Sequence, residues 1–264
     1  MATVQPVVAI RGVTKVFNGR GDNRVKALDE INLEIQPGEF VSLLGPSGCG
    51  KSTLLRLVGD LIPPTTGTVQ VNGKSAAQAR LDRNYGMVFQ QATLYEWRTI
   101  NKNVQLPLEV MNYSREKREA RAKDMLRLVQ LEEFDQHYPW QLSGGMQQRV
   151  AIARALAFEP SLLLMDEPFG ALDEMTRERM QMELLGIWGQ TQTTVVFVTH
   201  SISEAVFLSS RVAVMSARPG RIICMIDINL PRPRTFETRE DPRFFAKVTE
   251  VRECLRREEL KLKS

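Results

Sequence analysis

Runs of apolar residues along the chain predict a set of buried β-strands. Residues 40–44, 162–165 and 194–199 are short and almost continuously apolar, which is typical of strands covered on both faces of a sheet. Residues 31–35 instead alternate between apolar and polar side chains, as a half-exposed strand does. The two patterns together predict a buried central sheet and at least one more exposed strand.

The first part of the chain is predicted to consist of strands and turns around one glycine loop. Residues 7–10 favour a strand, residues 18–23 form a cluster of turn residues, and residues 67–73 resemble a hairpin. A glycine-rich stretch at residues 45–50 separates a buried strand from a helix predicted over residues 51–58. This order of strand, glycine loop and helix is a specific arrangement with a known chemical use.

Helical spacing dominates the middle of the chain. Residues 114–131 carry apolar side chains at helical intervals, and the serine at position 114 is placed to cap this helix. A further helix is predicted over residues 147–157, and we expect residues 92–157 to form a mainly helical subdomain. The end of the chain, residues 219–264, combines short strand signals with an amphipathic basic helix.

The composition of the 264 residues is that of an ordinary globular protein, with 43% hydrophobic and 25% charged residues. Lysine and arginine number 35 against 31 acidic residues, so the charge gives little support for a nucleic-acid partner. No apolar run approaches the ~18 residues of a membrane span, and the first residues lack the pattern of a secretory signal. Cys49, Cys224 and Cys254 show no disulfide-framework spacing, which favours a reducing, cytosolic compartment.

Residues 45–53 match the phosphate-binding loop G-x-x-x-x-G-K-[ST] in full. Glycines let the backbone curl so that successive N–H groups point at phosphate oxygens, and the N-terminus of the following helix adds positive potential. Lys51 is predicted to contact the β- and γ-phosphates of a nucleotide, and Ser52 to bind Mg²⁺. The predicted ATP-binding residues of this loop are Gly45, Pro46, Ser47, Gly48, Cys49, Gly50, Lys51, Ser52 and Thr53.

Cys49 lies inside this loop, at the start of a helix, where a thiolate is favoured. One hypothesis is therefore that alkylation of this thiol blocks activity and that MgATP protects it. The alternative is an inert small residue in a tight turn, and both readings stay open.

Two carboxylates, Asp166 and Glu167, end the apolar strand at residues 162–165. A strand end beside a phosphate loop is the place where an aspartate holds Mg²⁺, so we assign this role to Asp166. Glu167 is placed one residue further on, where a carboxylate can polarise an attacking water. Without the phosphate loop, both would be equally well explained as solvated loop residues.

Residues 142–149 begin with Leu-Ser-Gly-Gly and lead into a helix, which gives the chain a second anion-binding helix N-terminus. Because one nucleotide does not readily need two such sites from one subunit, we expect a second copy of the chain to present Ser143 and Gly145 across an interface. The simpler alternative is a serine-capped helix after a loop.

Together these motifs resemble the ATP-binding subunit of an ABC transporter, over about residues 7–230. The resemblance implies an α/β fold with a P-loop NTPase, RecA-like core, an antiparallel β subdomain and a helical signature subdomain. We expect residues 1–240 to form the ABC ATP-binding domain and residues 241–264 a C-terminal basic helical extension. Residues 142–149 resemble the family's signature motif, with Met146 at a position where the family varies. The signature residues implied to contact the opposite subunit's ATP are Leu142, Ser143, Gly144, Gly145, Met146 and Gln147.

The resemblance implies further roles, one residue at a time. Phe17 stands where the family stacks an aromatic ring on adenine, with a core phenylalanine beside a turn as the alternative. Gln90 matches the glutamine that contacts Mg²⁺ or water and senses the membrane partner, and Gln91 is its rival. Asp173 matches the loop that communicates across the dimer, and His200 the switch histidine at the γ-phosphate. The implied catalytic residues are Glu167, His200, Lys51 and Gln90, and the implied metal ligands are Ser52, Gln90 and Asp166.

Two residues depart from the pattern of relatives. Ser201 follows the switch histidine where many relatives have aspartate, which is expected to change local hydrogen bonding without abolishing hydrolysis. Residues 97–100, 169–177 and 215–222 resemble importers of the nitrate, sulfonate and taurine group, although Glu96 stands where that group usually has proline. The implied solute is an oxyanion or a small organic acid.

The resemblance also implies partners. Tyr95 and Trp97 lie near Gln90, in the region where the family receives a coupling helix of a multi-span permease, but they can equally pack the helical subdomain. The basic residues near the C-terminus are interleaved with glutamates, which favours a solvated helix face over lipid binding.

The sequence therefore predicts an ATP- and Mg²⁺-dependent ATPase that forms a head-to-tail dimer. We expect it at the cytoplasmic face of the inner membrane, peripheral, with permease subunits as direct partners, a solute-binding protein as an indirect partner and no nucleic acid. The alternative is the ATPase of an exporter or of another non-import ABC system. No heptad run supports a DNA-repair ATPase, and the single phosphate loop argues against a two-cassette translation factor.

Overall fold

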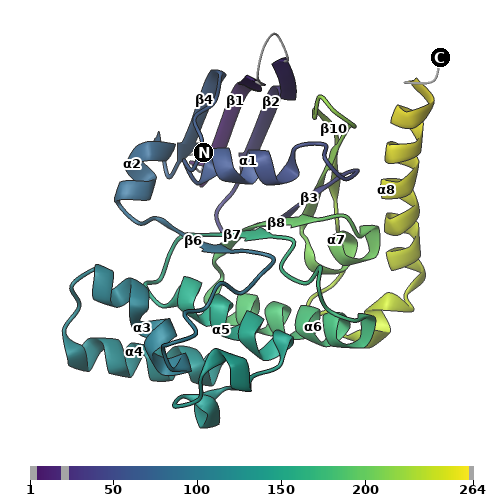
Figure 1. The fold of residues 1–264 in the computed structure, drawn as a ribbon. Helices are drawn as coiled ribbons and strands as arrows, with labels where there is room; N and C mark the ends of the chain where they lie inside the picture. Colours follow the sequence, from purple (N-terminus) through teal and green to yellow (C-terminus); the bar gives the residue numbers. More distant parts are fainter. Residues whose placement is uncertain (1–4, 19–23, 262–264) are drawn as a thin grey trace.

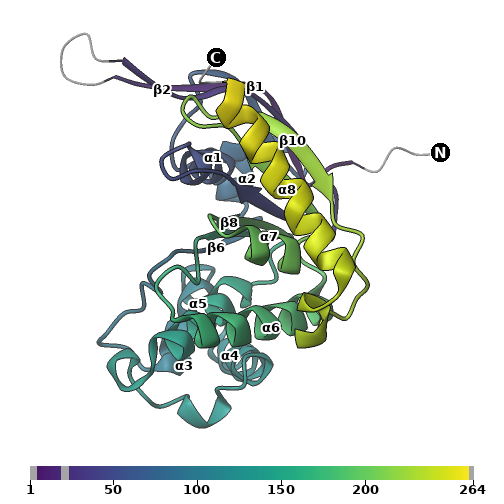
Figure 2. The same ribbon diagram turned by 90° about the vertical axis from the view of Figure 1, so that its right-hand side faces the viewer.

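The computed structural model describes residues 5–18 and 24–261 (Figures 1 and 2). The turn expected at residues 18–23 lies almost entirely outside the described residues. The same holds for the first four residues, which bear on the signal-peptide question, and for the last three of the basic tail.

A six-stranded sheet crosses the centre of the molecule, in the order β10-β9-β3-β8-β7-β6. Neighbouring strands are parallel from β9 to β6, and β10 is antiparallel at one edge. The predicted apolar strands occupy its interior and are confirmed, with β3 matching its predicted bounds. The strands are β3 (Phe40–Leu44), β6 (Tyr85–Val88), β7 (Leu162–Asp166), β8 (Thr194–Thr199), β9 (Arg211–Met215) and β10 (Ile222–Asp227).

A four-stranded antiparallel sheet lies above the central sheet in Figure 1, in the order β2-β1-β4-β5. Its strands are β1 (Val8–Asn18), β2 (Arg24–Ile35), β4 (Thr66–Val71) and β5 (Lys74–Ser75). Helix α1 (Lys51–Val58) contacts both sheets, and the short helix α2 (Ala76–Leu81) follows β5. The alternating residues 31–35 form the end of β2, with their apolar side chains turned into the core.

Helices form the lower layer in Figure 1: α3 (Ile100–Val110), α4 (Arg115–Leu128), α5 (Gly144–Leu156) and α6 (Glu174–Thr191). Two 3₁₀ turns, η1 (Glu132–Phe134) and η2 (Pro139–Gln141), connect α4 to α5. Helix α4 is capped as predicted, because the Ser114 side chain accepts a hydrogen bond from the Lys117 N–H at 3.4 Å. Helix α5 begins three residues earlier than predicted, because Ser143 caps it and both glycines lie in its first turn.

The last part of the chain comprises α7 (Ile202–Leu208), the 3₁₀ turn η3 (Phe236–Arg239) and α8 (Pro242–Lys261). Figure 2 shows α8 lying along β10, and a disulfide joins Cys224 of β10 to Cys254 of α8. The lack of disulfide-framework spacing in the sequence therefore does not exclude a bonded pair. Their spacing hides the pair because β10 and α8 become neighbours only in the folded chain.

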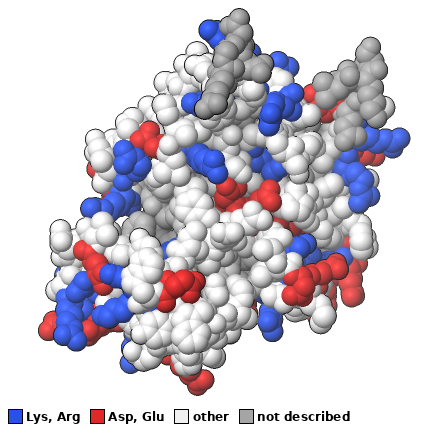
Figure 3. All heavy atoms as spheres, in the orientation of Figure 1, with Lys and Arg blue, Asp and Glu red and all other residues white. Residues whose placement is uncertain are grey.

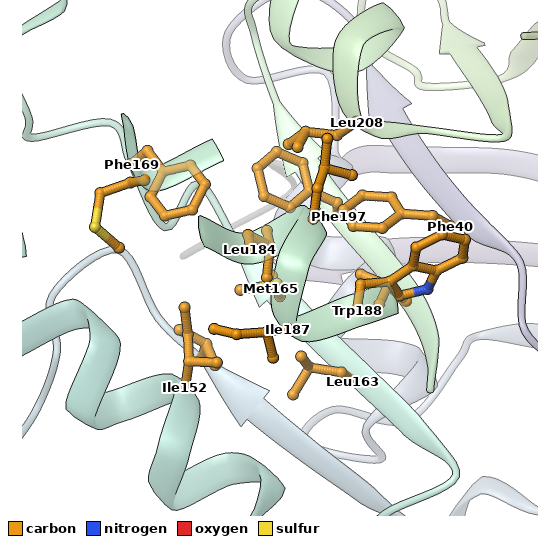
Figure 4. Close-up of a cluster of buried hydrophobic side chains, with 14 of the residues drawn as sticks. Phe40, Ile152, Leu163, Met165, Phe169, Leu184, Ile187, Trp188, Phe197 and Leu208 are labelled. Carbon is orange, nitrogen blue, oxygen red and sulfur yellow. The ribbon is translucent and has the colours of Figure 1, made fainter. Parts of the chain in front are cut away.

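The core lies on both faces of the central sheet. Figure 4 shows one part of it, in which Phe197 of β8 packs against Phe40 and Phe169, with ring centroids 5.7 and 5.9 Å apart. Trp188 of α6 covers Phe40 from the other side, at 6.1 Å. Within residues 5–18 and 24–261, no helix is both long enough and apolar enough to cross a bilayer.

Candidate functional site

The glycine loop wraps around the side chain of Lys51. Its ammonium group donates to the backbone carbonyls of Gly45 and Pro46 at 2.8 and 3.0 Å, and the residue is only 5% exposed. The loop borders an open cavity of about 440 Å³. A loop of this shape, closed on its own lysine and followed by a helix N-terminus, is built to bind phosphate groups.

Gly50 is the position in this loop that most strictly requires glycine. Its φ angle is 108°, a region that other residues rarely adopt. A Cβ atom there would lie 2.7 Å from Cδ2 of Leu28 and 3.0 Å from the carbonyl oxygen of Ala27. Strand β2 therefore supports the loop from behind so closely that no side chain fits.

Ser52 and Asp166 meet where α1 begins and β7 ends. The Ser52 hydroxyl donates to Oδ1 of Asp166 at 2.7 Å. A hydroxyl and a carboxylate at this separation supply the hard oxygen ligands that Mg²⁺ prefers. The pair thus fits the predicted metal site, although the assignment of ligands stays a prediction.

Glu167 and His200 come together at the carboxyl ends of two adjacent strands, β7 and β8. Nδ1 of His200 lies 3.2 Å from Oε2 of Glu167. Glu167 has a φ angle of 46°, and a positive value costs a residue other than glycine about 1–3 kcal/mol. Such strain persists only where surrounding contacts hold it. Here the Glu167 N–H donates to the Val198 carbonyl at 3.1 Å.

Gln90 follows β6, the next strand of the same sheet, and approaches the loop after Glu167. A Cβ atom on Gly170 would lie 3.1 Å from Nε2 of Gln90. The parallel order of β6, β7 and β8 thus brings three predicted site segments to one edge of the sheet. This edge is where ligands bind in open α/β sheets.

Phe17 borders the same cavity as the phosphate loop. Its ring is 42% exposed, and Nζ of Lys15 lies 5.1 Å from the ring centroid. A ring this exposed is not a core phenylalanine. The alternative reading is therefore wrong, and stacking on adenine stays a prediction.

The segment at residues 142–147 lies at the start of α5, in the lower layer of Figure 1, away from the loop that precedes α1. Ser143 caps α5 by accepting the Met146 N–H at 3.3 Å. The Gln147 amide donates to the carbonyls of Pro139 and Leu142 at 2.9 and 3.2 Å. Gly144 stays exposed, whereas Gly145 and Leu142 are buried. This segment thus presents an open helix N-terminus that the chain's own phosphate loop does not meet.

Asp173 and Ser201 both act as helix caps. Asp173 accepts the Thr176 N–H at 3.0 Å at the start of α6, and this hydrogen bond lowers the pKa of its carboxyl. Ser201 accepts the Glu204 N–H at 3.3 Å at the start of α7. Serine and aspartate are both good N-caps, so Ser201 can fill the capping role, and the expected change in hydrogen bonding near His200 stays a prediction.

Cys49 does not have the environment expected of a reactive thiol. The residue is 1% exposed, and burial raises the pKa of its thiol despite the nearby Lys51 ammonium. The expected preference for the thiolate is therefore wrong, because burial outweighs the helix N-terminus.

Arg218 is a candidate site residue that the motif reading missed. Its Nε and Nη2 atoms donate to the Gly48 carbonyl at 3.2 and 3.0 Å, and its side chain borders the phosphate-loop cavity. It lies in residues 215–222, which sequence reasoning used only as a subgroup marker. No local pattern shows that a loop so far along the chain folds back on the phosphate loop.

Tyr95 and Trp97 form an exposed aromatic pair rather than part of the core. Their rings stack with centroids 4.8 Å apart, and Trp97 is 74% exposed. The buried Asn103 side chain fixes their loop by donating to the carbonyls of Tyr95, Arg98 and Thr99 at 3.0–3.1 Å. The reading in which these aromatics pack the helical subdomain is therefore wrong for Trp97.

A separate apolar groove of about 380 Å³ lies between β6, α3 and α5. Its apolar lining includes Met87, Leu106, Val110 and Phe158. On the face shown in Figure 3, basic and acidic side chains are interspersed.

Comparison with known proteins gives a consistent result. The sequence profile of the ABC transporter family matches residues 28–170. Over 253 residues, the chain is 46% identical to a nitrate import ATP-binding protein of Synechocystis, with 94% of each chain covered. Over 216 residues, it is 48% identical to a taurine import ATP-binding protein of Rhizobium johnstonii, with 82% of each covered.

Among solved structures, a dimeric ATP-binding cassette in a post-hydrolysis state, bound to ADP and phosphate, superposes with a TM-score of 0.72. It is 39% identical to this chain and matches 87% of it and all of the cassette. The α/β fold expected from the sequence, with a central sheet, an antiparallel sheet and helices, is thereby confirmed.

Proposed function

Since the chain belongs to the ABC transporter family and is an ATPase of that family, we propose that it is the ATP-hydrolysing subunit of an importer for nitrate-, sulfonate- or taurine-type anions. The observation that carries the hydrolytic part is the pair of Glu167 and His200, 3.2 Å apart at the strand edge beside the phosphate loop. The solute class rests on the printed names of the nitrate and taurine relatives.

In this proposal Glu167 orients the attacking water and His200 holds the carboxylate in place. Lys51 leaves the carbonyls of its own loop and contacts the β- and γ-phosphates. Its charge, together with the polar contact of the His200 side chain, stabilises the negative charge that develops on the transferred phosphoryl group. Bound Mg²⁺, held by Ser52 and Asp166 with Gln90 nearby, supplies further neutralisation of the phosphates.

Two copies are proposed to assemble head to tail, with each ATP between the phosphate loop of one subunit and the Ser143–Gly145 turn of the other. The separation of these two segments within one chain supports this, because Ser143 and Gly144 are exposed at the start of α5 and the chain's own phosphate loop does not meet them. The dimeric cassette among the solved relatives supports it too. Asp173, at the start of α6, is proposed to communicate across the dimer.

We propose that the permease contacts the surface formed by Gln90, Tyr95 and Trp97. The exposed, stacked aromatics and the Asn103-braced loop support this, because a rigid aromatic pair gives large contact area at little entropic cost. The subunit would then sit peripherally at the cytoplasmic face of the membrane, with the solute-binding protein reached only through the permease. Residues 1–240, with a helical subdomain at 92–157, are proposed as the ATP-binding domain and 241–264 as an extension.

The hydrolytic assignment is tested with Glu167→Gln. We expect this variant to bind ATP, to lose turnover at least 100-fold, and to elute as a dimer in ATP. Glu119→Gln is the matched control, because Glu119 is an exposed carboxylate that pairs with Arg115 on the surface of α4. Turnover of Glu167→Gln at the rate of the control would refute the role of Glu167.

The transport assignment is tested by a pull-down from detergent-solubilised membranes. We expect a multi-span membrane protein to copurify, and Trp97→Ala to lose it. Trp140→Ala is the control, because Trp140 is 68% exposed and also lies beside a tyrosine, with its ring centroid 6.1 Å from that of Tyr138, but belongs to the turn η2. Copurification of only soluble partners, or of nucleic acid, would contradict a transport role.

A further inference from the structure

Two arginines in the segment between β10 and η3 donate hydrogen bonds to the end of helix α7, the helix that follows His200. Nη2 of Arg232 donates to the Leu208 carbonyl at 2.9 Å. Nη1 of Arg234 donates to the Phe207 carbonyl at 2.7 Å, and burial lowers the pKa of this arginine to about 9. These donors satisfy the last carbonyls of α7 and place positive charge at its C-terminus, where a helix favours it.

A third arginine, Arg239 of η3, holds the side of the same helix. Its guanidinium lies 3.8 Å from the ring centroid of Phe207 and 3.7 Å from a carboxylate oxygen of Glu178. Its Nη2 atom also donates to Oε1 of the buried Gln181 on α6. Arg239 therefore joins α6 and α7 immediately before α8 begins.

From Gln181 a chain of buried hydrogen bonds continues to the switch segment. Nε2 of Gln181 donates to Oε1 of Glu204 at 2.9 Å, and the Thr199 hydroxyl donates to Oε2 of Glu204. The Thr199 hydroxyl in turn accepts the Ser201 N–H at 3.0 Å. The chain thus ends on the two residues that flank His200.

The direction of these hydrogen bonds indicates that they stabilise a negative charge on the Glu204 carboxylate. Glu204 accepts at both carboxylate oxygens, as an ionised carboxylate does. Burial raises the pKa of Glu204, and the basic side chains facing it are Arg177 of α6, His200 of the switch segment and Arg239 of η3. Glu178 of α6, which pairs with Arg239, is the acidic group on that side. Removing the arginine leaves a buried carboxylate with less compensation, which is costly.

We propose that Arg239 is a positioning residue for ATP hydrolysis. It orients the His200 imidazole by fixing the backbone on either side of that residue. The proposal rests on the proposed function, in which His200 acts at the γ-phosphate. It gives the segment before α8 a role in turnover that no motif in the chain indicates. A variant that breaks this series of hydrogen bonds should lower kcat, because the His200 imidazole is no longer held in its orientation. The phosphate loop should still bind ATP.

The test compares Arg239→Met with Arg239→Lys in the full-length chain, by kcat, KM for ATP and Tm. We expect Arg239→Met to lower kcat at least tenfold with KM within twofold of the parent, and Arg239→Lys to recover most of kcat. Arg243→Met is the matched control, because Arg243 is exposed and pairs with Asp241 of the same turn. Its kcat should stay within twofold of the parent.

Two further variants separate positioning from folding. Gln181→Met interrupts the series of hydrogen bonds at α6 and leaves Arg239 in place. It should reproduce the kcat loss even where Arg239→Met fails to fold. The His200→Ala variant lowers kcat by itself. Adding Gln181→Met to it should cause no further loss, because the series of hydrogen bonds acts through the imidazole.

Each outcome bears on one proposal. Parental kcat in His200→Ala would overturn the proposed role of the histidine and, with it, this inference. A large loss in His200→Ala with parental kcat in both Arg239→Met and Gln181→Met would overturn the inference alone. Additive losses in the double variant, or equal changes in KM and kcat without recovery by lysine, would show a purely structural role.

Discussion

Replacing Gly50 by alanine adds one methyl group at the tightest point of the phosphate loop. The new Cβ would lie 2.7 Å from Cδ2 of Leu28 and 3.0 Å from the Ala27 carbonyl oxygen. The φ angle of 108° would also be imposed on a residue that disfavours it. The Leu28 side chain has to shift, and either the loop or the Ala27 backbone of β2 has to give way as well.

The two costs can be estimated separately. Holding a residue other than glycine at such a φ angle costs about 1–3 kcal/mol. Forcing a methyl group into a packed site costs about 1–3 kcal/mol more. We therefore expect Gly50→Ala to lower the free energy of unfolding by about 2–6 kcal/mol, or to weaken ATP binding at least tenfold if the loop relaxes instead.

Gly186→Ala is the matched control for this substitution. Gly186 lies in α6, and nothing lies within 4 Å of where its Cβ would be. Alanine is favoured over glycine by about 0.8–1.0 kcal/mol in a helix interior, so the control should be stabilised. Urea unfolding and titration with a fluorescent ATP analogue would measure both variants. Parental unfolding free energy together with parental ATP affinity in Gly50→Ala would refute the argument.

Three further changes have defined outcomes. Phe197→Ala removes a fully buried ring and should lower the free energy of unfolding by about 3–5 kcal/mol in urea. Iodoacetamide should label Cys49 at least ten times more slowly in the native chain than in the urea-unfolded chain, and equal rates would contradict its burial. Because burial raises the pKa of Glu204, the folded chain holds that proton to higher pH, so the unfolding free energy should fall as pH rises above about 4.5. Glu204→Gln should remove this slope, and an unchanged slope would show that other groups cause it.

The parts of the fold that sequence predicts best are those fixed by local pattern. The run at residues 40–44 is apolar because β3 is covered on both faces, and helix α1 begins at the lysine of the phosphate-loop motif. Helix α6 had no predicted bounds, because its polar residues are spread around it rather than confined to one face. Helix α5 begins at Gly144 and not at the predicted Gln147, because the Ser143 cap lets the two glycines form its first turn.

The features that sequence could not supply are contacts between segments far apart in the chain. Arg218, in the loop that follows β9, donates to the Gly48 carbonyl. Cys224 meets Cys254 only once α8 lies along β10. Neither contact leaves a periodic or spaced signal. The Cys49 thiol shows the same limit in its electrostatics, because the helix N-terminus is visible in the sequence but the burial that outweighs it is not.

The geometry of a single chain also explains why hydrolysis should depend on assembly. The cavity beside the phosphate loop is open to solvent, and the residues that line it run from Phe17 and the loop to Glu167 and Arg218. An ATP bound there keeps one face in water, where charges such as that of Lys51 act through a high dielectric and are weakened. If a second copy closes the cavity with its Ser143–Gly145 turn, water leaves and the same charges gain strength without moving. In the proposed dimer both copies would contact the γ-phosphate, so hydrolysis would remove the group that holds the dimer closed.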